Sequence, residues 1–328
     1  MPTQHPSERQ AALGALQARL AEAVARGTVG EEDRATSIPG LTFFRRDTPS
    51  GPSVCLVEPS VVLVAQGAKQ LLIGEQASIY DTDRFLIASL DLPAASQVLE
   101  ASPGKPCLGL SLRLDLRVLA ELAAHAKLPS PRDRAAEGSA ALGTVTPLLL
   151  EPIGRLLALL DEPDDLTVLA PLIEREIRYR LLRSDVIHYR LLRSDVAGRL
   201  LEIAAAGSQG RRVARAIDWM KSNYARPLHV DDLAAHVQMS ASSLHHHFRR
   251  LTAMSPLQYQ KWMRLNEARR MMLNDGVDAA SAAFRVGYES PSQFSREYGR
   301  LFGAPPKRDV ASLRDRARTV APQVAADA

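Results

Sequence analysis

The stretch VDDLAAHVQMSASSLHHHFRRL, residues 230–251, decides how the second half of the chain folds. Apolar residues recur at helical spacing on both sides of a short polar break at residues 238–240. Ser240 stands where its side chain can cap a second helix by accepting a hydrogen bond from a free backbone N–H. The pattern predicts two short helices joined by a tight turn, a helix-turn-helix.

The second of these helices has a polar face. With Leu244, Phe248 and Leu251 turned inward, the opposite face carries four side chains at helical offsets: Ser242, His245, His246 and Arg249. Such a face can enter a major groove and read bases while nearby arginines hold phosphates. An ordinary helical hairpin has the same apolar pattern, so one motif alone leaves both interpretations open.

The same arrangement recurs in AASAAFRVGYESPSQFSREYGRLF, residues 279–302, where Ser290 matches Ser240 at a distance of 50 residues. The second turn is one residue longer and contains Gly287, which suits a left-handed backbone. Pro291 follows the cap at the first helical position, where its missing N–H costs nothing. The repetition favours a bipartite DNA-binding region over a chance hairpin.

A helix predicted from Ser255 to about Leu273 joins the two units. Ser255 and Gln258 have the spacing of a capping box, and Pro256 occupies the first helical position. At 1.5 Å per residue the helix is roughly 28 Å long. This is close to the ~34 Å between successive major-groove faces on one side of B-DNA, so we expect the two units to enter adjacent turns of the duplex.

Residues from about Arg212 to Val310 resemble the DNA-binding domain of the AraC/XylS family of bacterial transcription regulators. The resemblance rests on LAAHVQMSASSLHHHF, MSPLQYQKWMRLNEARRMML, RVGYESPSQFSREYGRLFG and the following Ala-Pro-Pro. It implies a seven-helix domain with two helix-turn-helix units that binds double-stranded promoter DNA. Carried over by position, the base readers are Ser242, His245 and His246 in the first unit, and Ser292, Gln293, Ser295 and Arg296 in the second.

The first half of the chain has a different pattern. After a predicted amphipathic helix at residues 8–26, strand-like runs begin at LTFFRRD (41–47) and continue to CLGLSLRL (107–114). Seven or eight short strands without intervening helices predict a compact barrel or sandwich. EPSVVLVAQGAKQLLIG, YDTDRFLIASLDLPAASQV and EASPGKPCLGLSLRLD resemble the cupin-like N-terminal domain of one branch of the same family. The resemblance implies a small-molecule effector held in the barrel.

The predicted fold class is α+β, a cupin-like β-barrel with helices followed by an all-α domain. The expected divisions are an N-terminal helix (1–35), the barrel (36–125), a helical dimerisation and connecting region (126–206), the DNA-binding domain (207–312) and a disordered tail (313–328). Helices in the connecting region are expected to form a homodimer, or else to pack on their own barrel. The resemblance also implies an activator that works with RNA polymerase.

Residues 177–196 contain a tandem duplication, IRYRLLRSDV followed by IHYRLLRSDV. Ten residues turn a helix by about 1000°, roughly 80° short of three turns. The second copy must therefore extend a helix with a rotated apolar face, or a loop must form around residues 183–185.

An enzyme is the competing interpretation, because barrels of this type also carry metal chemistry. Residues 41–113 contain no histidine, which excludes a His-x-His metal site, and their acidic residues lack ligand spacing. Consecutive histidines on a helix point about 100° apart, so a zinc site at residues 245–247 is not expected either, and His247 should point away from DNA. We expect binding without catalysis, cofactor or metal. A non-specific architectural DNA protein is a third possibility.

The two cysteines, Cys55 and Cys107, are expected to be small buried residues of the barrel. The alternative is that one of them senses an effector, an electrophile or oxidant, through its thiolate. Their number and spacing fit a reducing cytoplasm, and the absence of an apolar leader or an 18-residue apolar run predicts a cytoplasmic protein without a membrane segment.

The net charge differs between the strand-rich first part of the chain and the part that contains the two helix-turn-helix motifs. Lys and Arg minus Asp and Glu give 22 − 26 = −4 for residues 1–210 and 19 − 11 = +8 for residues 211–328, which sum to the net charge of +4. The basic half is the one with the repeated motif, as phosphate binding requires.

Overall fold

Ten β-strands form the centre of the first half of the chain, in a computed structural model that describes residues 6–125, 140–188, 200, 203 and 208–320. The strands are β1 (Asp33–Ala35), β2 (Leu41–Arg46), β3 (Ser53–Val57), β4 (Ser60–Gln66), β5 (Ala68–Ile73), β6 (Gln76–Tyr80), β7 (Arg84–Ala88), β8 (Leu92–Glu100), β9 (Cys107–Arg113) and β10 (Ala140–Thr144). The predicted strand-rich domain is confirmed. The chain divides into two units, Met1–Arg211 and Arg212–Ala328.

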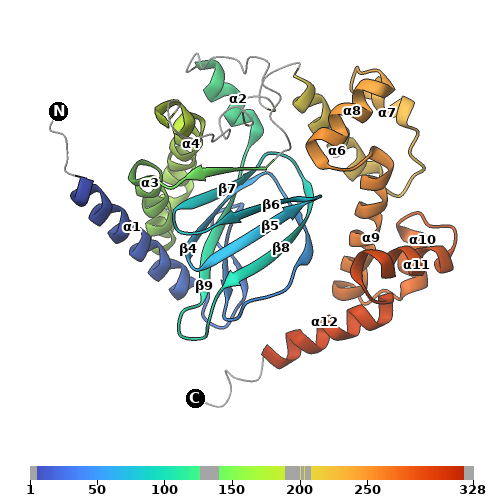
Figure 1. Cartoon of the computed structure of the whole chain (residues 1–328), viewed down its shortest axis with the longest axis horizontal. Helices are drawn as coiled ribbons and strands as arrows, with labels where there is room; N and C mark the ends of the chain where they lie inside the picture. The colour runs from blue at the N-terminus through green and yellow to red at the C-terminus, as the bar shows by residue number, and fades with distance from the viewer. Residues whose placement is uncertain (1–5, 126–139, 189–199, 201–202, 204–207, 321–328) are drawn as a thin grey trace. The chain divides into compact units, whose positions relative to one another are not determined.

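The strands pair antiparallel in two sheets, in the orders β1-β2-β9-β4-β7-β10 and β3-β8-β5-β6. Side chains from both sheets, among them Phe44, Val64, Leu71 and Val98, pack together in the space between them. Hydrogen bonding within the described residues therefore gives two facing sheets and no closed ring (Figure 1).

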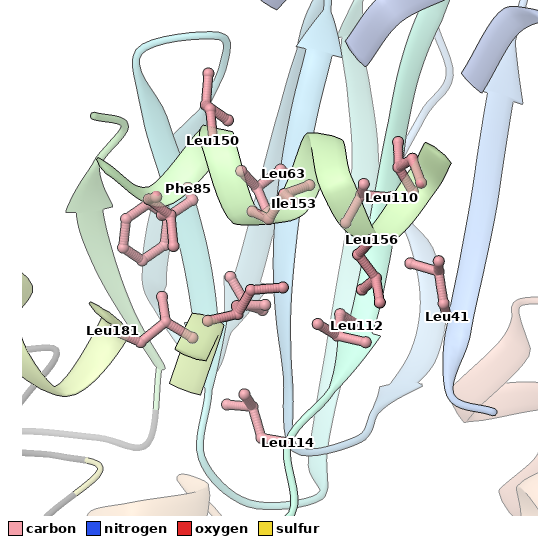
Figure 2. Packing of buried hydrophobic residues seen from close by; sticks show 14 of the residues in the cluster. Leu41, Leu63, Phe85, Leu110, Leu112, Leu114, Leu150, Ile153, Leu156 and Leu181 are labelled. Atoms are coloured by element: carbon pink, nitrogen blue, oxygen red, sulfur yellow. The ribbon is translucent and has the colours of Figure 1, made fainter. Parts of the chain in front are cut away.

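Helices cover the other face of the six-stranded sheet. They are α1 (Pro6–Gly27), α2 (Leu116–His125), α3 (Pro147–Ala158), the short 3-10 helix η1 (Leu159–Asp161) and α4 (Pro163–His188). Figure 2 shows Ile153 and Leu156 of α3 lying over sheet residues such as Leu63 and Leu110. All four side chains are at most 2% exposed. These helices thus pack on the sheet of their own unit, one of the two alternatives left open by the sequence.

Helix α4 runs without a break through the first copy of the duplication, residues 177–186. Ile177, Leu181 and Leu182 are fully buried, and Arg178 pairs with Glu174 at 2.6 Å. The alternative of a loop at residues 183–185 is therefore wrong for this copy. Most of the second copy, residues 189–196, lies outside the described part of the chain, as do residues 126–139 and 207.

The second unit is helical. Its helices are α6 (Gln209–Asn223), α7 (Val230–His236), α8 (Ala241–Thr252), α9 (Pro256–Asn274), α10 (Ala279–Arg285), α11 (Pro291–Phe302) and α12 (Pro306–Val320). Residues 313–320 were expected to be a disordered tail, but they continue α12, since Arg and Ala in RDRAR are strong helix formers. Across the residues that the structure describes, no helix is long and apolar enough to cross a membrane.

Candidate functional site

The first helix-turn-helix consists of α7, a four-residue turn and α8. Ser240 Oγ accepts a hydrogen bond from the Ser243 N–H at 3.2 Å, which confirms the predicted cap. The inward side chains are buried as expected: Leu233, Ala234, Val237, Leu244, Phe248 and Leu251. Gln238 in the turn has φ 58°, a left-handed conformation that costs a residue with a side chain about 1–2 kcal/mol.

The residues of this unit that were predicted to face DNA lie together on the outer face of α8. Ser242, His245, His246 and Arg249 are all exposed. His247 is half-buried, and its Nδ1 has no hydrogen-bond partner within the described part of the chain. Burial lowers the pKa of His247, and the charges of Arg250 and His246 lower it further. The half-buried position of His247 agrees with the expectation that it points away from the base-reading face.

The second helix-turn-helix repeats this geometry with α10 and α11. Ser290 Oγ accepts from the Gln293 N–H at 3.3 Å, and Asp278 caps α10 by accepting from the Ala280 and Ser281 N–H groups at 3.0 Å each. Gly287 has φ 88°, the left-handed conformation that the sequence predicted. The four predicted readers of α11 are exposed: Ser292, Gln293, Ser295 and Arg296.

Glu297 connects the reading face of α11 to the helix that joins the two units. Its carboxylate accepts hydrogen bonds from Lys261 of α9 at 3.0 Å, from Tyr288 at 2.8 Å and from the Gln293 amide at 3.3 Å. Partial burial acts to raise the pKa of Glu297, but these three donors outweigh it, so the pKa lies below its ordinary value. Gln293 is therefore held by a neighbour on its own helix while it faces outward.

Arg264 of α9 connects the segment that leads into the first helix-turn-helix with the turn of the second. Its Nε donates to the Tyr224 carbonyl at 2.7 Å and its Nη2 to the Arg226 carbonyl at 2.8 Å, both in the segment between α6 and α7. Its Nη1 donates to the Gly287 carbonyl at 3.0 Å, in the turn of the second unit. Gln260, one helical turn earlier, donates to the same two carbonyls of the α6–α7 segment.

A buried ion pair fixes α12 against α9 and α11. Asp309 accepts two hydrogen bonds from Arg269 of α9, each at 2.8 Å, and a third from the Tyr298 hydroxyl at 2.7 Å. The roles of Arg264, Glu297 and Asp309 are not visible in the sequence, because a charged side chain on a helix normally indicates a solvated face. Within the described ranges, no group of three or more His, Cys, Asp or Glu side chains is arranged to hold a metal ion.

The two cysteines line the space between the sheets of the first unit. Cys107 of β9 is buried, Cys55 of β3 is half-buried, and both are free thiols. Burial raises the pKa of both thiols, and the nearby Lys69 charge acts in the opposite direction. Their placement fits the expectation of small residues inside the domain.

Two capped helix-turn-helix units on one connecting helix, each with an exposed polar face, define a double helix-turn-helix DNA-binding domain. Two family models match the chain: the AraC-type transcriptional regulator N-terminus over residues 37–189, and a helix-turn-helix domain over residues 233–311. The chain belongs to the AraC-type transcriptional regulators.

The curated relatives match only part of this chain. The HTH-type transcriptional regulator ArgR of Pseudomonas aeruginosa is 31% identical over 103 residues, 31% of this chain and 31% of that protein. The putative HTH-type transcriptional regulator YneL of Escherichia coli is 68% identical over 37 residues, 11% of this chain and 63% of that protein. The chain thus spans less than two thirds of the length of these relatives.

Solved structures extend the likeness to both units. ToxT from Vibrio cholerae O395 covers 85% of this chain and 97% of its own, with a TM-score of 0.53 and 8% identity. ToxT from strain SCE256 with a bound unsaturated fatty acid covers 82% of this chain and 94% of its own, with a TM-score of 0.53 and 9% identity. At these identities the likeness shows the fold alone.

Proposed function

We propose that this protein is a sequence-specific activator of transcription, controlled by a small-molecule effector that binds between the two sheets of its first unit. The observation that carries the proposal is the pair of exposed polar faces on α8 and α11. Each belongs to a serine-capped helix, and α9 with Arg264 sets their separation. A fixed separation between two reading helices is what recognition of two successive major-groove segments requires.

In this proposal the base readers are Ser242, His245 and His246 of α8 and Ser292, Gln293, Ser295 and Arg296 of α11. Arg249, on the same face of α8, adds a contact to DNA, as its exposure supports. Arg296 is the strongest candidate for guanine, since its guanidinium can donate two hydrogen bonds to one base edge.

The protein would act in the cytoplasm on promoter DNA, as a homodimer that recruits RNA polymerase. Support for the dimer comes from α4, where Val168 and Leu172 are 66% and 61% exposed at a spacing of four residues. Leu148 of α3 is a further exposed apolar side chain in this helical layer. Effector binding would favour one placement of the two DNA-binding units over another. The first unit is proposed to bind its ligand without converting it.

Genomic mapping of binding sites, followed by binding assays on purified sites, tests the proposal. His245→Ala and Arg296→Ala should each lose about 1–3 kcal/mol of discrimination at particular base positions. Arg19→Ala, which removes an exposed arginine from α1 of the other unit, is the matched control and should change nothing. An equal loss on every sequence would show phosphate contacts instead, and no loss would refute the assignment of these faces to DNA.

A further inference from the structure

Glu297 lies next to the exposed face of α11, one helical turn after Gln293. The Glu297 side chain is only 15% exposed, whereas Gln293 is an exposed residue. The Oε1 atom of Glu297 accepts hydrogen bonds from the Lys261 ammonium at 3.0 Å and from the Gln293 amide at 3.3 Å. Its Oε2 atom accepts from the Tyr288 hydroxyl at 2.8 Å. The carboxylate therefore receives donors from α9, from the turn before α11 and from α11 itself (Figure 1).

Glu297 is ionised at neutral pH. Partial burial acts to raise its pKa, but the hydrogen bonds from Lys261, Tyr288 and Gln293 outweigh burial, so the pKa lies below its ordinary value. An ionised carboxylate can only accept hydrogen bonds. The atom of the Gln293 side chain that faces the carboxylate is therefore the amide nitrogen and not the carbonyl oxygen. The Lys261 ammonium balances the negative charge of this carboxylate beside the face that is proposed to meet DNA.

The contact with Glu297 fixes which hydrogen-bonding group Gln293 offers to a base. A free glutamine can turn its terminal amide by about 180° and present either its oxygen or its nitrogen. With its nitrogen held, Gln293 presents the carbonyl oxygen, which is an acceptor. In the major groove, cytosine N4 and adenine N6 are donors, whereas guanine and thymine present acceptors. The second amide N–H of Gln293 can add a hydrogen bond to adenine N7.

We propose that Glu297 is a positioning residue for base recognition, through which Gln293 selects adenine or cytosine over guanine and thymine at one position of the α11 half-site. The inference rests on the proposed function, since it requires α11 to enter the major groove. It adds a residue that touches no base to the set that determines the operator. The matching positions of α8, 50 residues earlier, hold Ser243 and His247, so the carboxylate–amide pair belongs to the second unit.

Selection of binding sites by the full-length protein from a pool of random DNA duplexes tests this assignment. Gln293→Ala identifies the base position that Gln293 reads, because the preference should be lost at that position alone. There, wild type should favour adenine or cytosine by about tenfold. Glu297→Met, which has no acceptor, should remove most of that preference and leave the preferences at the other positions unchanged. The double variant should behave as either single variant does.

Two control variants separate the acceptor from the charge of Glu297. Glu297→Gln keeps an oxygen that can accept from the Lys261 ammonium and from the Gln293 amide, so it should retain the preference. Lys261→Met leaves the contact between Gln293 and Glu297 in place and should also retain the preference. The thermal transition of each variant shows whether it is folded.

The proposal is overturned if folded Glu297→Met keeps the wild-type preference, or if it weakens the preference at all base positions alike. It is also overturned if Gln293→Ala changes no position, if wild type favours guanine or thymine at the Gln293 position, or if Glu297→Gln loses the preference as fully as Glu297→Met does. In each of these cases wild type still selects a defined site, so the proposed function stands. A wild-type protein that selects no site from the pool would refute the proposed function instead.

Discussion

Gly287, in the turn between α10 and α11, is the position where the second helix-turn-helix tolerates least change. Its φ of 88° disfavours any residue with a side chain. A Cβ at this position would lie 2.0 Å from the Ala225 carbonyl oxygen. Real Cβ atoms do not approach an oxygen so closely, so Gly287→Ala must displace the segment between α6 and α7.

The magnitude follows from two contributions. The left-handed conformation costs alanine about 1–2 kcal/mol. The displaced Ala225 carbonyl accepts a hydrogen bond from Arg264 at 3.3 Å, and its neighbours accept shorter ones from the same guanidinium. Losing one hydrogen bond to a charged group costs about 1.5–3 kcal/mol. Gly287→Ala should therefore destabilise the second unit by about 2.5–5 kcal/mol.

Gly276 provides a matched control in the same unit. Its φ is 67°, but a Cβ there meets no atom within 4 Å, so Gly276→Ala should cost only the conformational 1–2 kcal/mol. Urea unfolding followed by tryptophan fluorescence measures both, since the two tryptophans, Trp219 and Trp262, lie in the second unit. If Gly287→Ala costs no more than Gly276→Ala, the close approach to Ala225 is not rigid and the reasoning fails.

Three further predictions concern two hydrogen-bonded carboxylates and the two thiols. Asp309→Ala leaves the Arg269 guanidinium without its buried partner and should destabilise the second unit by about 3–5 kcal/mol in the same urea assay. The pKa of Glu297 lies below its ordinary value of 4.5, so its stabilisation is complete above that pH and is lost as the pH falls through the lowered pKa; Glu297→Gln should flatten the acid side of a urea midpoint-against-pH curve, and an unchanged curve would contradict this. Cys55 and Cys107 should react with iodoacetamide more slowly than a solvent-exposed thiol at pH 7.5, and faster as the pH rises past 9.0, because burial raises the pKa of both thiols above that figure. An unchanged effector response after serine replaces both would rule out sensing by a thiolate.

The helix-turn-helix units could be predicted from sequence because their signals are local. Ser240, Ser290 and Pro291 mark helix starts, Gly287 marks a turn, and the apolar spacing identifies the inward faces. Each depends only on residues within one turn of helix. The same local evidence placed the outward side chains of α8 and α11.

Features that depend on distant pairing could not be predicted. Strand β10, in AALGT, has little intrinsic strand preference and forms because it pairs with β7, where Gly143 leaves room for the ring of Phe85. Strand β1 lies before residue 41, where the predicted strands begin, because three exposed residues carry no alternating apolar pattern. Arg264 has the same difficulty in a helix, because its acceptors lie 38 and 23 residues away along the chain.

The contacts of Arg264 also constrain which operators such a protein can use. The α6–α7 segment and the second turn are both hydrogen-bonded to one guanidinium. We therefore expect α8 and α11 to keep one distance and one angle relative to each other. Inserting one base pair between the two half-sites moves the second by about 3.4 Å and rotates it by roughly 35° around the duplex axis. Under the proposed function, operators can therefore diverge in the bases that α8 and α11 meet, but they must keep the phase between the two half-sites.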